Sequence, residues 1–158
     1  FFGLIYIAGG MTYLFLLRDF NIKPLHNTRA IWLACLATWA TDTGAYFTGR
    51  FLGKRKLASM LSPNKTIEGA LGGIILTCIV VSVFLTVLNN FTFYWIIYAI
   101  ILAIIAITGD LFESAIKRNV GVKDSGSFIP GHGGILDRFD SLLFTIPFTY
   151  YFLIFMLK

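Results

Sequence analysis

The residues that could do chemistry lie mostly between positions 109 and 141, in the stretch GDLFESAIKRNVGVKDSGSFIPGHGGILDRFDS. Only 13% of the whole chain is charged, against about 25% in an average soluble domain, yet this stretch holds many charges of both signs. They are Asp110, Glu113, Lys117, Arg118, Lys123, Asp124, Asp137, Arg138 and Asp140, with one histidine, His132. Because charged groups are costly beside apolar segments unless they are paired or bind a ligand, this concentration indicates a polar site.

The types of residue indicate phosphate and metal chemistry. Mg²⁺ is usually held by one or two carboxylates, and phosphates and waters complete its octahedron. Asp110 and Asp137 lie on different predicted helices and are the expected ligands. The basic residues are more numerous than two carboxylates need: Lys54, Lys65, Lys117, Arg118, Lys123 and Arg138. This surplus is typical of a site for a polyphosphate, since phosphoryl transfer depends mostly on positioning and charge neutralisation.

Glycines surround His132 at positions 131, 133 and 134. Without side chains, they would let backbone amides approach an anion closely. Acid–base work by His132 is one candidate role, and an orienting or merely polar loop residue is the other. Ser114 lies four residues after Asp110, and so on the same helical stripe as Lys117 if the helix continues past position 108.

The rest of the chain has the composition of a membrane protein. It is 57% hydrophobic, its mean hydropathy is +0.78, and several apolar runs approach the roughly 20 residues that cross a bilayer. The fold class that we predict is all-α, a polytopic membrane helical bundle with about five transmembrane helices. The expected spans are residues 1–17, 30–48, 68–89, 91–108 (with the helix running on to about 118) and 138–157.

Asp42 lies inside the second expected span. A carboxylate at membrane depth costs on the order of 3 kcal/mol and is by default a functional candidate. Thr38, Asp42 and Tyr46 recur every four residues and should share one helix face. A structural carboxylate that accepts hydrogen bonds from neighbouring hydroxyls is the alternative.

Residues 49–67 form a basic loop that contains Ser62-Pro63-Asn64-Lys65-Thr66. Serine before proline is a good N-cap and first-turn pair, so we expect a helix to begin at Ser62. A helix N-terminus beside Lys65 would bind an anion. The alternative is an ordinary positive cytoplasmic loop.

A short Asn89-Asn90 turn should make the third and fourth spans antiparallel neighbours. The two active-site loops, 49–67 and 117–137, then lie on one side of the membrane. Because they carry most of the lysines and arginines, that side should be cytoplasmic. Nucleic acid is excluded as a partner, since no basic tracts alternate with exposed aromatics.

Residues 114–140, SAIKRNVGVKDSGSFIPGHGGILDRFD, resemble the signature of the CDP-diacylglycerol synthases, also called phosphatidate cytidylyltransferases. The likeness includes S-x-x-K-R, the K-D pair, P-x-H-G-G and D-R-x-D, and it extends upstream to DTGAYFTGRFLGKRKL and SPNKTIEG. Where members of the family often have a proline, this chain has Ser59.

The resemblance implies transfer of the cytidylyl group of CTP to phosphatidic acid, giving CDP-diacylglycerol and pyrophosphate. It implies Mg²⁺ as the required cofactor, and a second cation is an open alternative. It implies that Asp110 and Asp137 bind metal, with Asp42 and Asp140 as further candidate ligands. The implied catalytic residues are Asp110, Lys117, His132 and Asp137. The implied substrate-binding residues are Ser62, Lys65, Ser114, Arg118, Lys123 and Arg138.

We therefore expect residues 1–158 to be one transmembrane catalytic region, from the C-terminal part of a longer chain, in a bacterial inner (cytoplasmic) membrane. The site should face the cytoplasm, where CTP arrives, while phosphatidic acid arrives through the lipid bilayer; a homodimer is one candidate assembly. A CTP-dependent polyprenol or phytol kinase is an alternative enzyme, and an ion-coupled transporter is an alternative of another class.

Overall fold

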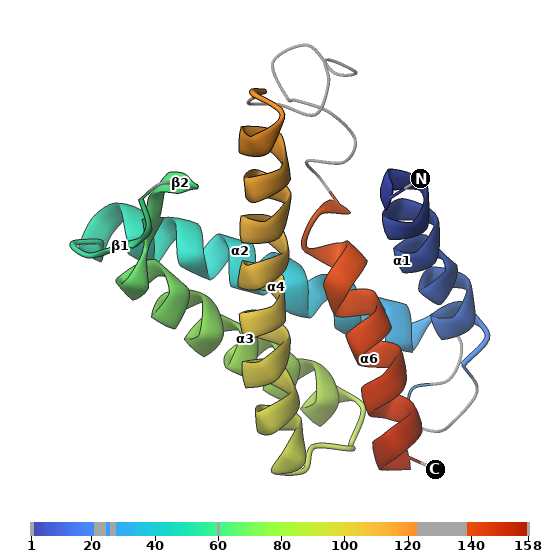
Figure 1. The fold of residues 1–158 in the computed structure, drawn as a ribbon. Coiled ribbons are helices and arrows are strands. Elements are labelled where there is room, and N and C mark those ends of the chain that lie inside the picture. The colour runs from blue at the N-terminus through green and yellow to red at the C-terminus, as the bar shows by residue number, and fades with distance from the viewer. Residues whose placement is uncertain (1, 21–24, 26–27, 60, 123–138, 158) are drawn as a thin grey trace.

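A computed structural model describes residues 2–20, 25, 28–59, 61–122 and 139–157. Apart from one small hairpin, the described chain is helical (Figure 1). Its elements in order are α1 (Phe2–Arg18), α2 (Arg29–Leu52), β1 (Lys56–Ala58), β2 (Ser62–Thr66), α3 (Ile67–Val87), α4 (Tyr94–Asn119) and α6 (Leu142–Leu157). The helices lie where the apolar runs predicted them, and α4 continues past position 108 as expected.

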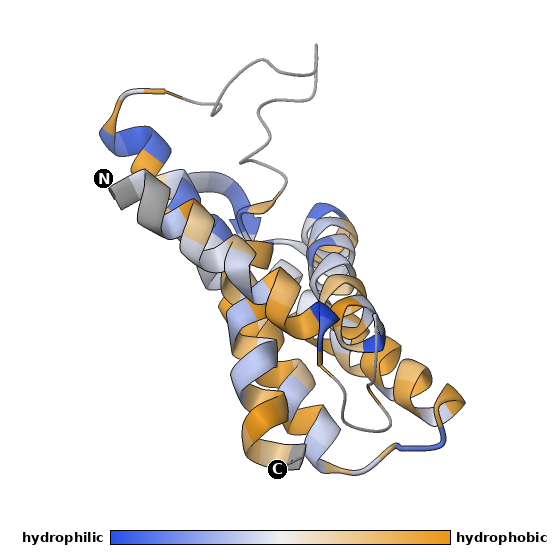
Figure 2. Cartoon of the chain, turned by 90° about the vertical axis from the view of Figure 1, so that its right-hand side faces the viewer, coloured by the Kyte–Doolittle hydropathy of each residue, from blue (hydrophilic) through white to orange (hydrophobic). Residues whose placement is uncertain are grey.

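The predicted number of transmembrane helices is only partly supported. Within the described residues, two helices are long and apolar enough to cross a membrane, α3 and α4, while the apolar segment Leu142–Met156 is shorter. One face of α3 exposes a stripe of large apolar side chains at four-residue spacing, as expected for a helix surrounded by hydrocarbon. The stripe consists of Leu71, Ile75, Ile79, Val83 and Val87. Figure 2 shows hydrophobic residues predominating along the helices.

The opposite side of α3 packs closely on α2. A Cβ atom on Gly72 would lie 2.0 Å from Thr48 Oγ1, and one on Gly44 would lie 2.7 Å from the carbonyl oxygen of Gly72. The hydroxyls of Thr41 and Thr77 are 2.7 Å apart across the same interface. Small residues and paired hydroxyls are how helices associate tightly in lipid, so α2 and α3 form a closely packed pair (Figure 1).

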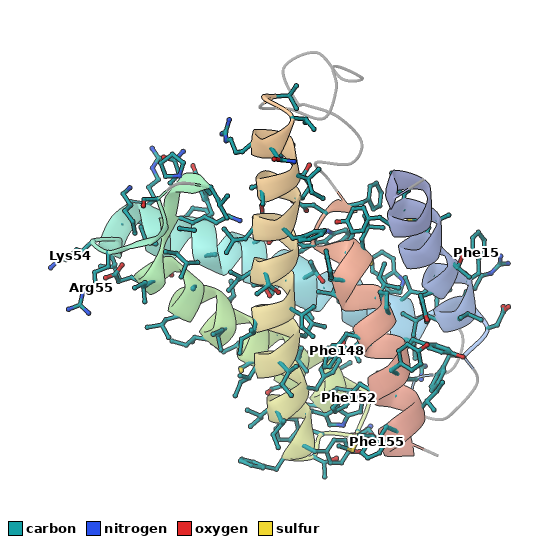
Figure 3. The ribbon with its side chains drawn as sticks, viewed as in Figure 1. Phe15, Lys54, Arg55, Phe148, Phe152 and Phe155 are labelled. Carbon is teal, nitrogen blue, oxygen red and sulfur yellow. The ribbon has the colours of Figure 1, made fainter. Side chains whose placement is uncertain are left out.

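Helix α4 packs against α2, α3 and α6, and α2 passes behind it to contact α6 and α1 as well (Figure 1). The core side of α4 buries Trp95 and Tyr98, and the Tyr98 hydroxyl is 2.9 Å from Thr149 Oγ1 of α6. Phe148 and Phe152 of α6 pack against the Tyr98 ring (Figure 3). The upper end of α4 extends beyond this apolar core and carries the charged residues.

The hairpin contradicts one prediction. The fold is mostly helical, as predicted, but no helix begins at Ser62, because Ser62–Thr66 forms strand β2 and pairs antiparallel with β1. Helix α3 begins only at Ile67, with Thr66 as its N-cap: Thr66 Oγ1 accepts a hydrogen bond of 3.1 Å from the Gly69 amide. Serine before proline was compatible with a helix start, but strand pairing placed that start five residues later.

Candidate functional site

A cavity of about 770 Å³ opens where the hairpin, α2, α3, α4 and the residues before α6 meet. Its lining is unusually polar for a chain of this composition. Asp42, Tyr46 and Arg50 come from α2; Ser62, Asn64, Lys65 and Thr66 come from β2; Asp110 and Lys117 come from α4; Asp140 and Ser141 precede α6. Segments that are distant in the sequence therefore contribute to one site.

Three carboxylates from three segments line this cavity: Asp42, Asp110 and Asp140. Lys65 lies among them, and its Nζ atom is 2.6 Å from Asp110 Oδ2. Asp140 lies outside the helices, just before α6. Its pKa is raised to about 6, mainly because the carboxyl group is partly buried and also because the negative charge of Asp110 is nearby. The Asp140 Oδ1 atom also accepts a hydrogen bond of 2.6 Å from the Ser141 amide. Such a group of acids calls for a cation.

The donor set suits a magnesium ion shared with a phosphate better than a site enclosed by protein. Within the described residues, no three His, Cys, Asp or Glu side chains are close enough together to hold a metal by themselves. Mg²⁺ commonly uses one or two carboxylates and takes its other ligands from water and substrate phosphates. Asp110, with Asp140 or Asp42, fits that requirement.

A second lysine reaches the cavity from α4 itself. Lys117 Nζ is 2.5 Å from Oε2 of Glu113, one turn earlier on the helix. Glu113 is only 1% exposed, whereas the Lys117 side chain is 19% exposed and lines the cavity. The buried Glu113 carboxylate therefore forms an ion pair with Lys117 on the core side, while the lysine side chain lines the cavity. Glu113 is not among the site residues predicted from the sequence.

Arg50 and Tyr46 form a pair at the cavity that we did not expect. Arg50 Nη1 donates a hydrogen bond of 2.7 Å to the Tyr46 hydroxyl, and its guanidinium carbon lies 6.0 Å from the centre of the same ring. Both residues line the cavity and both are exposed. Their spacing of four residues on one helix was the signal that could have revealed this pair.

The hairpin is fixed to α3 by Glu68. Its Oε2 atom accepts hydrogen bonds from the Lys54 and Arg55 amides, at 3.0 and 3.1 Å. The Ile67 amide donates to the Arg55 carbonyl oxygen at 2.9 Å. These bonds hold the turn after α2 and therefore the strand that carries Lys65 into the cavity.

The structure brings together six of the predicted site residues, all of which line the cavity: Asp42, Ser62, Lys65, Asp110, Lys117 and Asp140. Lys54, Ser114 and Arg118 do not line it: Ser114 is half-buried on α4, and Lys54 and Arg118 are exposed. Thr38, expected to share a face with Asp42, does not line the cavity either, and its hydroxyl is 2.8 Å from that of Thr145 on α6. The remaining predicted residues lie outside the described part of the chain: Lys123, His132, Asp137 and Arg138.

Curated relatives resemble this chain along most of its length. It is 45% identical over 146 residues to the phosphatidate cytidylyltransferase of Bacillus subtilis, covering 91% of this chain and 54% of that protein. It is 42% identical over 147 residues to the phosphatidate cytidylyltransferase of Haemophilus influenzae, covering 89% and 51%. The chain thus spans about half the length of the curated relatives it matches.

A solved structure shares the fold. It is described as "Structural insight into an intramembrane enzyme for archaeal membrane lipids biosynthesis" and superposes with a TM-score of 0.61 at 21% sequence identity. The match covers 78% of this chain and 77% of that one. At this identity the likeness establishes the arrangement of the helices.

The family model described as "Cytidylyltransferase family" matches residues 1–156, nearly the whole chain and all of the segments that line the cavity. The chain therefore belongs to the cytidylyltransferase family.

Proposed function

We propose that the protein transfers the cytidylyl group of CTP to phosphatidic acid, giving CDP-diacylglycerol and pyrophosphate. The observation that carries this proposal is the cavity in which three aspartates and two lysines meet. A transfer between two phosphorylated molecules needs cations that neutralise both, and carboxylates that hold a divalent ion between them. The names of the relatives in Bacillus and Haemophilus supply the two substrates.

In the proposed reaction, an oxygen of the lipid phosphate attacks the α-phosphorus of CTP. A new phosphorus–oxygen bond forms, the bond from the α-phosphorus to the β-phosphate oxygen breaks, and pyrophosphate leaves with the electron pair. Lys65 and Lys117 would bind phosphate oxygens of the two reactants, which repel each other in water. Ser62 and Asn64 on the same strand as Lys65 can donate hydrogen bonds to the same oxygens.

Mg²⁺ is the proposed cofactor. Bound there, it would neutralise the charge that develops on the triphosphate as pyrophosphate leaves. Asp110 would hold it with Asp140 or Asp42, and Asp137 is predicted to be a further ligand. Lys65, which pairs with Asp110, would then move its ammonium group toward a phosphate. The two side chains are 23% and 34% exposed, but the Lys65 Nζ atom itself is buried, so Asp110 is the more accessible partner of the pair.

We also propose that all five described helices cross or enter the membrane and that the cavity opens to the cytoplasm. The exposed apolar stripe of α3 supports a bilayer around the molecule. The cavity lies at the end of α4 that carries Lys117 and Arg118, and a basic end is expected on the cytoplasmic side. Phosphatidic acid would reach the site laterally from the inner membrane, and CTP from the cytoplasm.

Product analysis tests the proposal. Membranes from cells that express the protein are given phosphatidic acid and CTP labelled in the cytidine, with and without Mg²⁺. We expect a labelled liponucleotide and one pyrophosphate per molecule formed, with formation lost in EDTA and restored by Mg²⁺.

Two results would contradict the proposal. Labelled CDP without a liponucleotide, when a polyprenol or phytol is supplied, would indicate a CTP-dependent lipid kinase. No consumption of CTP, together with ion-driven uptake into proteoliposomes, would indicate a transporter.

A further inference from the structure

The turn between α2 and the hairpin forms a corner that is at once basic and apolar. Its basic side chains belong to three consecutive residues, Lys54, Arg55 and Lys56, all exposed. Its apolar side chains are Phe47, Phe51 and Leu52, which are 53%, 75% and 64% exposed. We name these six residues the basic-apolar corner.

Within the described residues, the basic side chains of this corner form no ion pair. The ion pairs there join Lys65 to Asp110 and Lys117 to Glu113, and none includes Lys54, Arg55 or Lys56. Glu68 lies under the turn, but its Oε2 atom accepts hydrogen bonds from the backbone amides of Lys54 and Arg55. Figure 3 shows the Lys54 and Arg55 side chains extending outward from the edge of the molecule.

The corner adjoins the cavity without being part of it. Arg50 lies between Phe47 and Phe51 in the sequence, and Leu57 follows Lys56. Both line the cavity, whereas none of the six corner residues does. The hydrogen bonds that Glu68 accepts and the pairing of Lys56 with Thr66 fix the backbone of the turn. The backbone of the corner is therefore held next to segments that line the cavity.

An anionic bilayer surface would favour both the apolar and the basic side chains of the corner. Phenylalanine and leucine side chains gain free energy by leaving water for the acyl boundary, while lysine and arginine extend their charges to the headgroups. Each basic residue near an anionic surface contributes about 1 kcal/mol of attraction. Water alone would hydrate the three basic side chains but would leave three large apolar side chains exposed.

We propose that the basic-apolar corner binds anionic phospholipid headgroups of the surrounding bilayer and concentrates the anionic lipid substrate at the cavity entrance. The identity of that substrate as phosphatidic acid rests on the proposed function; headgroup binding by the corner does not. The corner raises the local concentration of one substrate and leaves the chemical step and the binding of CTP unchanged.

The test uses a variant with Lys54→Gln, Arg55→Gln and Lys56→Gln, compared with the unmodified protein in phosphatidylcholine vesicles. Spin-labelled phosphatidic acid and spin-labelled phosphatidylcholine report which lipid associates with the protein, independently of turnover. Arg18→Gln is the control, because it removes an exposed cation at the far end of α1, which does not line the cavity. Arg55→Gln alone gives the matched single substitution.

We expect the unmodified protein and Arg18→Gln to prefer phosphatidic acid over phosphatidylcholine, and the triple variant to lose most of this preference. The mole fraction of phosphatidic acid that gives the half-maximal rate should rise roughly tenfold in the triple variant. This rise is smaller than the loss of about 1 kcal/mol for each of the three basic residues would give, because other cations of the protein still attract the lipid. The KM for CTP should not change. Arg55→Gln should shift the lipid dependence in the same direction by a smaller factor.

An unchanged lipid preference in the triple variant would overturn the inference. So would a raised KM for CTP with unchanged lipid dependence, since the corner would then bind nucleotide. If the unmodified protein selects phosphatidic acid but forms no CDP-diacylglycerol, the proposed function fails while headgroup binding stands.

Discussion

Two lysine–carboxylate pairs lie one turn apart on α4 and differ in burial. In the first, Lys65 comes from the hairpin to Asp110, and the two side chains are 23% and 34% exposed. In the second, Lys117 pairs with Glu113 on the same helix, and the carboxylate is 1% exposed. The first pair connects strand β2 to helix α4 across the cavity. The second pair connects a lysine that lines the cavity to a carboxylate buried in the core.

This difference assigns different duties to similar groups. The Lys65–Asp110 pair should contribute less to stability than a fully buried pair, because water still reaches the Asp110 side chain even though the Lys65 Nζ atom is buried. A buried carboxylate has lost its hydration, so its lysine becomes important to the stability of the fold. We therefore propose that Asp110 is available to a ligand, whereas Glu113 positions the Lys117 ammonium group.

The largest effect should follow from Asp110→Asn. It keeps the size of the side chain but removes the charge that pairs with Lys65 and would hold Mg²⁺. Loss of an electrostatic contact in the transition state typically costs about 100-fold to 1000-fold in rate, so we expect at least a 100-fold fall in cytidylyl transfer. The thermal unfolding midpoint in detergent should change little.

Asp19→Asn is the matched control for this prediction, since Asp19 is an exposed acid beyond the end of α1 that does not line the cavity. It should retain full activity. If Asp110→Asn retained normal turnover with Mg²⁺, Asp110 would have no part in binding the metal.

The second effect compares Lys117→Met with Lys65→Met. Lys117→Met leaves Glu113 buried without its lysine, and removing one partner of a buried pair costs about 3–5 kcal/mol. Lys65→Met breaks a partly exposed pair and should cost at most about 1 kcal/mol of stability, while raising the KM for CTP. Chemical unfolding in detergent micelles and initial rates measure both quantities.

A double variant, Glu113→Gln with Lys117→Met, separates positioning from a purely structural role. If Glu113 acts through Lys117, its substitution lowers kcat/KM in the parent protein but adds little further loss in Lys117→Met. Equal losses in both backgrounds would mean that Glu113 affects activity independently of Lys117.

The smallest effect should follow from Thr66→Ala. This change removes the N-cap of α3, where Oγ1 accepts from the Gly69 amide, and typically costs about 1 kcal/mol. Because Thr66 follows Lys65, the variant should weaken the Lys65–Asp110 pair and leave Lys117 in place. Thr66→Ser, which keeps the capping oxygen, should behave as the parent in thermal unfolding; a full loss in Thr66→Ser would exclude capping as the cause.

The helices and part of the site could be predicted from the sequence for local reasons. Apolar runs located the helices to within a few residues, because backbone groups in an apolar environment must be satisfied within the helix. Asp110 and Lys117 were expected on one stripe because the helical repeat places them there. The Lys117–Glu113 pair has the same local origin, with a spacing of four residues.

The prediction at Ser62 was wrong because its outcome depended on a non-local partner. Serine before proline is locally compatible with a helix start, but strand Lys56–Ala58 pairs with Ser62–Thr66, and capping passes to Thr66. Which strand pairs with which is decided by the turn between them and by the Glu68 contacts. A local pattern does not contain those contacts.

The sequence by itself determined the helical segments, the concentration of charge near position 110 and the resemblance to the cytidylyltransferases, since each depends on residue types and short spacings. Only the tertiary structure decided that Lys65 meets Asp110 and that Asp42 and Asp140 line the same cavity. Burial was decided there too: Glu113 and Asp110 are both acids on one helix, but only packing determines which of them water and substrate can reach.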